Sequence, residues 1–457
     1  MARRSRARRV AALRASALEK AELLVPPRRS NSEEVLRRQG SGKKVARVAN
    51  SYRGVALAGG GPLGAIYEIG ALVALEEALD GLDLIGCDVY VGVSSGSFLA
   101  AGLANGLSAK AMHQMFIESE LADDPFEPDL LLQPAFGEFA SRIAQVPKLL
   151  APAAKEYFEH GGSTGFFESF SRLARALPTG IFDNTRVGTY LTRLLSGPAR
   201  TNDFRQLKHK LFLVATDIDT GASVPFGAPG WDDVPISRAV QASAALPGLF
   251  PPVEIGGRYY VDGALTKTLH ASVGLREGVK LLLCVNPLVP FDARLAASKK
   301  HRKAISVVQG GLPSIMSQTF RTLIYSRMRS GMERYRKDFP DADIVLFEPD
   351  RDDVEMFFTN VFSYSDRRRL CEHAYQRTRD GLRHRAEVRK VLAKHGIRIN
   401  DEVLFDEQRT LSKPAPSDRR RSQSALGLTA NQLEQTLDQL ETVLHGCAKR
   451  LHDRHPI

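Results

Sequence analysis

The sequence predicts an α/β fold in which a mostly parallel central sheet carries helices on both faces. Two short apolar stretches, "GVALAG" (54–59) and "DVYVGV" (88–93), are typical of buried strands. Each is followed by a glycine-containing turn and a helical pattern, "GAIYEIGALVALEEAL" (64–79) and "SGSFLAAGLANG" (95–106). A repeated order of strand, turn and helix favours parallel strands joined by crossover helices.

The rest of the chain supplies further elements of the same kind. Residues of about 105–200 lack clear strands and predict a helical insertion over the sheet. Strand patterns return in three segments, "KLFLVATDIDTGASVPFG" (210–227), "GGRYYVDGAL" (256–265) and "VKLLLCVNPLV" (279–289). We then expect a basic helix at 312–337, a last strand in "DADIVLFEP" (341–349) and more helix at 363–396.

Composition shifts divide the chain into five segments. These are a basic arm (1–50), a catalytic domain (51–290, including the insertion), a mixed helical extension packed on it (291–408), a low-complexity linker (409–428) and a C-terminal amphipathic helix (429–457). The last segment has apolar residues spaced four and three apart between 433 and 451. This seam fits self-association through 429–452, or docking of the helix on its own domain.

The positive charge of the chain is concentrated in the arm. The formal net charge is +11, and residues 1–50 carry 14 basic and 4 acidic side chains. The other 407 residues carry 49 basic and 48 acidic side chains, so a nucleic-acid-binding body is not expected. Residues 1–24 can form a basic amphipathic helix, which predicts peripheral contact with an anionic membrane; a solvated, disordered arm is the alternative.

We expect a cytoplasmic protein, peripheral on the inner membrane surface where the arm binds. The N-terminus lacks the apolar core of a secretory signal, and the four cysteines (Cys87, Cys284, Cys371 and Cys447) form no C-x-x-C pair. Residues 54–75 contain no Lys or Arg, but Gly59 to Pro62 and the acidic Glu68 argue against a transmembrane helix there.

A candidate nucleophile lies in "DVYVGVSSGSFLAAG" (88–102). Gly92 and Gly96 each stand two residues from Ser94, between an apolar strand and a helix. A catalytic serine on a sharp strand-to-helix turn needs such small neighbours, and the helix N-terminus favours developing negative charge. An ordinary glycine–serine turn would give the same pattern.

A second glycine-rich turn, "AGGGPLGA" (58–65), suits an oxyanion hole. Gly59, Gly60 and Gly61 can turn their amides into a cavity, and the helix that follows adds its dipole. The spacing of Gly59, Gly61 and Gly64 also fits a dinucleotide-binding loop. We favour the oxyanion hole, because the acidic residues about 20 positions further on lie in a loop rather than at a strand end.

Two residues are candidates for the general base. His270 follows a strand and turn near the right part of the sheet, and histidine is the usual base. Asp262 is better placed, because it ends an apolar strand directly before Gly263. An ordinary aspartate, with a pKa of about 3.9, is a weak base for an alcohol, but burial can raise its pKa. A simple turn-forming role for Asp262 is the alternative.

The three motifs together resemble the signatures of the patatin-like phospholipases. They are Gly59 to Gly64, Gly92-Val93-Ser94-Ser95-Gly96 and Asp262-Gly263-Ala264, in that order. The resemblance covers roughly residues 52–290 and implies a three-layer α/β sandwich with a Ser–Asp dyad that cleaves acyl esters of lipids. It implies that Ser94 is the nucleophile, that Asp262 accepts its proton without a histidine, and that the amides of Gly60 and Gly61 form the oxyanion hole.

The resemblance leaves the lipid class open. The family usually has Arg or Lys where this chain has Leu63, which affects the expected head-group preference. A lipid acyl hydrolase resembling phospholipase A or lysophospholipase is the leading hypothesis. A triacylglycerol lipase, an acyl thioesterase, a nucleotide-binding enzyme and a catalytically silent membrane-associated scaffold are alternatives. No metal-ligand cluster is visible, so no metal or other cofactor is expected.

Deletion of residues 1–50 should weaken binding to anionic vesicles and flatten its salt dependence. Each Lys or Arg near an anionic surface contributes about 1 kcal/mol, which salt screens. Vesicle sedimentation at several salt concentrations measures both effects. Hydrolysis of a short soluble ester should survive the deletion. Undiminished vesicle binding by the truncated chain at low salt would contradict the membrane role of the arm.

Overall fold

The computed structural model describes residues 52–118, 179–300, 306–358 and 366–411. Contacts divide the chain into two compact units, Met1–Arg409 and Thr410–Ile457, and the description below concerns the first. The arm, most of the insertion, the linker and the C-terminal helix lie outside the described residues.

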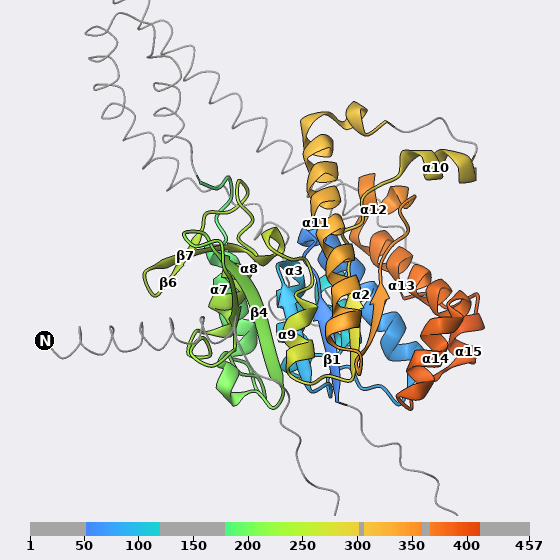
Figure 1. Cartoon of the computed structure of the whole chain (residues 1–457), viewed down its shortest axis with the longest axis horizontal. Helices are drawn as coiled ribbons and strands as arrows, with labels where there is room; N and C mark the ends of the chain where they lie inside the picture. The colour runs from blue at the N-terminus through green and yellow to red at the C-terminus, as the bar shows by residue number, and fades with distance from the viewer. Residues whose placement is uncertain (1–51, 119–178, 301–305, 359–365, 412–457) are drawn as a thin grey trace, which may run out of the picture. The chain divides into compact units, whose positions relative to one another are not determined.

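One mixed sheet of eight strands forms the centre of the described unit (Figure 1). Its strands are β1 (Arg53–Leu57), β3 (Val89–Val93), β4 (Lys210–Asp217), β5 (Ser223–Phe226), β6 (Val253–Ile255), β7 (Arg258–Asp262), β8 (Leu281–Val285) and β9 (Asp343–Phe347). Five strands run parallel in the order β4-β3-β1-β8-β9, β5 and β7 pair antiparallel with β4, and β6 pairs antiparallel with β7. The expected mostly parallel α/β sheet is therefore confirmed.

Helices cover both faces of this sheet. They are α2 (Gly61–Ala78), α3 (Ser95–Ala104), α4 (Ala109–His113), α7 (Thr185–Leu195), α8 (Ile236–Ser243), α9 (Ala271–Arg276), α10 (Ala293–Lys300), α11 (Gly311–Asp338), α12 (Val354–Phe358), α13 (Asp366–His384), α14 (Ala386–Lys394) and α15 (Asp401–Phe405). On one face, α9 and α11 form a core cluster with alternate residues of the strands. On the other face α3 and α8 pack on β4, and α2 lies against α3 and along α13.

Alternation along β3 shows how the strands fit between these layers. Val89, Val91 and Val93 belong to the core cluster on the α9 and α11 side. Gly92 faces α3, where a Cβ would lie 2.5 Å from the Ser97 Cα. Apolar side chains on both faces explain why the strands appear in the sequence as continuous apolar runs.

Some elements differ from the sequence expectation. The short helices α8, α9 and α15, the strand β6 and a two-stranded sheet of β2 (Leu79–Asp80) with β10 (Arg398–Ile399) were not expected. They are too short to show a clear hydrophobic period.

Residues 54–75 divide between β1 and α2, and none of the described helices has the length and apolar character needed to cross a bilayer. Cys87, Cys284 and Cys371 are buried free thiols.

Replacing Gly70 with Ala should destabilise the fold at the α2–α13 contact. A Cβ at Gly70 would collide with the Cys371 carbonyl oxygen and lie 3.0 Å from the Ala374 Cβ. Overpacking against backbone costs about 1–3 kcal/mol of unfolding free energy. Gly331 in α11 is the matched control, because its nearest neighbour atoms, in Tyr335, lie 3.7 Å away or more. Gly331→Ala should leave stability unchanged or raise it by up to about 1 kcal/mol. Urea unfolding measures both, and equal stability of the two variants would contradict this packing.

Candidate active site

Strand β4 brings the predicted nucleophile and the predicted base together. Along β4, pairing with β3 ends at Val214, which is opposite Val93. Pairing with β7 begins at the next residue, Ala215, which is opposite Asp262. Ser94 directly follows Val93, so Ser94 and Asp262 are held at adjacent positions of one strand although they are far apart in sequence.

Ser94 lies in a strained turn between β3 and α3. Its backbone has φ 53° and ψ −125°, a conformation that residues other than glycine rarely adopt. Such strain persists only where the surroundings enforce it, and it is common at active sites. The side chain is buried in its turn, with 6% of the residue exposed. α3 begins at Ser95, so the N-terminus of this helix adjoins the hydroxyl.

Ser243, at the end of α8, holds the backbone of this turn. The Ser94 amide donates to Ser243 Oγ at 2.9 Å, and Ser243 Oγ donates to the Val214 carbonyl at 2.6 Å. The Ser97 hydroxyl donates to the Ser94 carbonyl. These bonds connect the turn to β4 and to α3, which explains how the unusual dihedral angles are maintained.

Asp262 is buried and faces Ser94. Its Oδ1 accepts a hydrogen bond from the Ala264 amide at 2.8 Å. Burial raises the pKa of Asp262 to about 6, although the adjacent Ser94 side chain and the Ala264 amide oppose this rise. The carboxylate is therefore mostly ionised at pH 7 and is a stronger base than an exposed aspartate.

His270 lies behind the turn that follows Asp262. Its Nε2 is 3.2 Å from the Gly263 carbonyl oxygen and 3.3 Å from Thr266 Oγ1. Burial lowers the pKa of His270 to about 4, and the contact with Gly263 only partly offsets this. Burial therefore reverses the usual order of base strength, since the Asp262 carboxylate holds a proton more tightly than the His270 ring. Among the described residues, no hydrogen bond joins His270 to Ser94.

The glycine loop borders the same turn. A Cβ at Gly59 would lie 2.9 Å from the Ser94 Cβ, so only glycine allows this approach. Gly60 caps α2 and Gly61, with φ 61°, is its first residue, so their amides have no acceptor within the helix. Gly60 and Gly64 also contact Pro287, which follows β8. Amides at this position beside the serine can stabilise an oxyanion.

The other motif residues provide close packing. A Cβ at Gly96 would lie 2.5 Å from the Ala58 carbonyl oxygen, and one at Gly263 would collide with the Val214 carbonyl. Ala264 is buried, and its methyl group would lie 3.2 Å from a Cβ at Gly59. Gly92, Gly96, Gly263 and Ala264 thus let β1, β3, β4 and β7 converge at one point.

Three residues near the site were not singled out as site residues from the sequence. Ser243 and Pro287 hold the serine turn and the glycine loop, and neither carried a sequence signal beyond its place inside the span of roughly 52–290 that the resemblance covers. Glu68 is fully buried one turn after Gly64. Burial raises the pKa of Glu68 well above its ordinary value, and only the Ala58 amide, which already donates to Val285 at 3.1 Å, favours the charged form. Burial therefore disfavours the charged form of this carboxyl group.

Leu63, where the resemblance predicts a cation, is buried with 6% of the residue exposed. An apolar side chain at this position lines the protein interior rather than a head-group site. Among the described residues, no cluster of three His, Cys, Asp or Glu side chains has the arrangement of a metal site.

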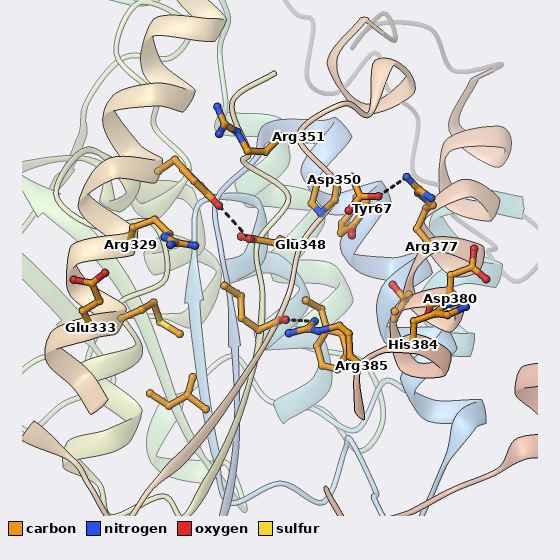
Figure 2. Close-up of a pocket in the computed structure, with 18 of the residues that line it drawn as sticks. Tyr67, Arg329, Glu333, Glu348, Asp350, Arg351, Arg377, Asp380, His384 and Arg385 are labelled. Carbon is orange, nitrogen blue, oxygen red and sulfur yellow. Dashed lines mark hydrogen bonds and ion pairs between the residues drawn. The ribbon is translucent and has the colours of Figure 1, made fainter. Parts of the chain in front are cut away.

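A separate polar cavity of about 840 Å³ lies between α11, the end of β9 and α13 (Figure 2). Its described lining includes five arginines and four carboxylates but no serine or cysteine. Several of these groups already pair with one another: Tyr325 donates to Glu348 at 3.2 Å, and Arg377 binds Asp350 at 2.6 Å. None of the predicted site residues lines it, so the cavity is distinct from the Ser94–Asp262 pair.

Comparison with known proteins relates this geometry to one family. Residues 55–273 match the model of the family described as patatin-like phospholipase. The matched span begins in β1 and ends in α9, and it includes Gly59, Ser94 and Asp262.

The curated relatives and the solved structures share little sequence identity with this chain. Uncharacterized NTE family proteins of Mycobacterium bovis and Mycobacterium tuberculosis are 26% identical over 247 residues, which cover 54% of this chain and 32% of each relative. The aligned part thus spans about a third of those relatives. The crystal structure of VipD from Legionella pneumophila is 15% identical, covering 94% of this chain and 86% of VipD, with a TM-score of 0.35. The ExoU–SpcU complex of Pseudomonas aeruginosa is 17% identical, covering 93% and 72%, with a TM-score of 0.28.

The pH dependence of ester hydrolysis should identify the base. If Asp262 accepts the proton, it must be ionised, so kcat/KM for a soluble ester should fall as the pH drops through about 6. A stopped assay between pH 4 and pH 9 measures this profile. Since the pKa of His270 is about 4, an inflection near 4 in place of one near 6 would instead identify His270 as the base.

Proposed function

We propose that the chain, whose residues 55–273 match the model of the patatin-like phospholipase family, is a lipid acyl hydrolase that cleaves carboxylic esters, resembling phospholipase A or lysophospholipase. The observation that carries the proposal is that β4 holds Ser94 and Asp262 at adjacent positions, where the Ser94 side chain favours the ionised form of the buried Asp262 carboxyl group. The glycine loop beside Ser94 supports it, because an acyl-transfer site needs donors for an oxyanion as well as a nucleophile.

In the first half of the reaction, Asp262 removes the proton from Ser94 Oγ as the oxygen attacks the ester carbonyl carbon. The raised pKa of Asp262, about 6, makes this transfer easier than it would be for an exposed aspartate. Negative charge then develops on the former carbonyl oxygen. The amides of Gly60 and Gly61 and the N-terminus of α2 are suited to stabilise that charge.

The tetrahedral intermediate collapses to an acyl-enzyme when the alcohol leaves with the proton from Asp262. In the second half, water attacks the acyl carbon, and Asp262 accepts a proton from the water. Breakdown of the second intermediate releases the fatty acid and returns the proton to Ser94. One carboxylate thus serves as base and acid in turn, and the Ala264 amide keeps it oriented throughout.

Ser94→Ala should abolish ester hydrolysis while the fold is retained. Loss of the serine nucleophile can cost on the order of a millionfold in rate. Ser95→Ala and Ser97→Ala are the matched controls and should cost far less, because neither hydroxyl faces Asp262. A panel of phospholipids, lysophospholipids, triacylglycerols and acyl thioesters, assayed with wild type and Ser94→Ala, tests the activity and its substrate class. A dead Ser95→Ala beside an active Ser94→Ala would overturn the assignment.

Asp262→Asn should also remove almost all activity, because it keeps the shape of the side chain and removes the base. His270→Gln is the matched control, since glutamine can still donate toward the Gly263 carbonyl. This control should retain activity and the inflection near pH 6. Equal loss in the two variants would instead indicate a Ser–His arrangement. Reaction of wild type with a fluorophosphonate probe, absent in Ser94→Ala, separates an enzyme from a catalytically silent scaffold.

A further inference from the structure

The solvent-facing side of α11 changes character along its length. In its first half this side carries an apolar stripe made of Leu312, Ile315, Met316, Phe320 and Leu323, all exposed. The opposite side of the helix packs on the protein through Met328, Met332 and Tyr335 in its second half. A helix normally turns polar residues to water. Together with Val308 just before α11, the stripe supplies six of the twelve large apolar side chains that are exposed among the described residues.

The first half of α11 extends beyond the carboxyl edge of the sheet. Tyr325 reaches Glu348, the residue after β9, and Arg321 reaches the Val289 carbonyl beyond the end of β8. Leu312 lies about three and a half helical turns before Tyr325 and thus farther from the strands. Figure 1 shows α11 rising past the end of the sheet.

This part of α11 is firmly attached to the body. Gln318 makes two hydrogen bonds with the backbone of Phe291, at 3.0 and 2.8 Å. Arg321 is buried and stacks over Phe357 at 5.3 Å. The stripe therefore belongs to a fixed helix and not to a mobile loop.

The same edge of the sheet holds the candidate active site. Ser94 follows the end of β3, and Pro287, which contacts Gly60 and Gly64, starts the segment that reaches Val289 and Phe291 under α11. On the other side of the site, the exposed apolar residues Ile218 and Leu249 follow β4 and α8. Apolar side chains are thus exposed after β4 and after α8 as well as on α11.

The charge pattern of α11 favours a lipid surface over a protein partner. Between residues 306 and 326 the single charged side chain is Arg321, which is buried. Residues 327–337 then carry five basic side chains and one acidic side chain, all exposed. An uncharged apolar tip followed by a basic band matches the order of layers in an anionic membrane, with acyl chains inside and head groups outside.

We propose that the α11 stripe inserts into the surface of an anionic lipid bilayer and holds the carboxyl edge of the sheet against it. The inference rests on the proposed function, because a lipid hydrolase must reach substrate packed in a membrane. It differs from the expected role of the basic arm, since the contribution of the stripe comes from apolar burial, which salt does not screen.

Vesicle binding by the full chain carrying Ser94→Ala tests this surface without the need for hydrolysis. The vesicles contain phosphatidylcholine with an equal amount of phosphatidylglycerol, and sedimentation is measured at low and high salt. Adding Leu312→Gln, Met316→Gln and Leu323→Gln together should weaken partitioning at least about tenfold at both salt concentrations. Phe405→Gln is the matched control, because Phe405 is 62% exposed on α15, away from this edge, and its change should leave binding intact.

Three outcomes would overturn the proposal. The first is equal binding of the triple variant and its parent. The second is a loss that appears equally in Phe405→Gln, which would show a general effect of surface polarity. The third is a drop in molar mass in the triple variant by light scattering, which would show that the stripe pairs two copies of the chain.

In the protein that keeps Ser94, the triple change should reduce hydrolysis of vesicle lipid more than hydrolysis of a short soluble ester. If stripe-dependent binding occurs but wild type hydrolyses no lipid, the proposed function fails and the surface stands.

Discussion

Strand β4 passes from pairing with β3 to pairing with β7 between Val214 and Ala215, and the candidate site depends on this change of partner. The parallel partner delivers Ser94 at the end of β3. The antiparallel partner, which enters from the opposite direction, delivers Asp262. Ser243 also links the serine turn to β4, because its hydroxyl accepts from the Ser94 amide and donates to the Val214 carbonyl. One strand therefore sets the distance between nucleophile and base, and the glycine loop after β1 fits beside them.

Burial determines the chemistry of this point more than any charged neighbour does. Asp262 and His270 lie close together in the sequence, yet desolvation moves their pKa values in opposite directions. The aspartate is charged when it loses a proton, whereas the histidine is charged when it gains one. Burial is thus the physical cause that favours Asp262 over His270 as the candidate base. Burial also raises the pKa of Glu68, which disfavours a second negative charge near the amides of the glycine loop.

The sequence alone predicts the parallel strands, the order of the three motifs and the strand-to-helix turn at Ser94, because each depends on residues close together in the chain. It also selects Asp262 as the candidate base, through the resemblance and the strand end before Gly263. It does not predict Ser243 or Pro287 as supports, because their roles arise from contacts across more than 100 residues. The apolar stripe of α11 also escapes a sequence pattern: residues 312–337 look like one basic helix, and only the fold shows which side of its first half faces water.

The backbone of Ser94 has a further consequence for the history of this chain. At φ 53° a glycine would be relieved of strain that costs of order 1–3 kcal/mol for other residues. Random substitution under selection for stability alone would therefore drift toward glycine at this position. A serine in so unfavourable a conformation, next to a buried carboxyl group, therefore lowers the stability of the fold relative to a glycine at the same place.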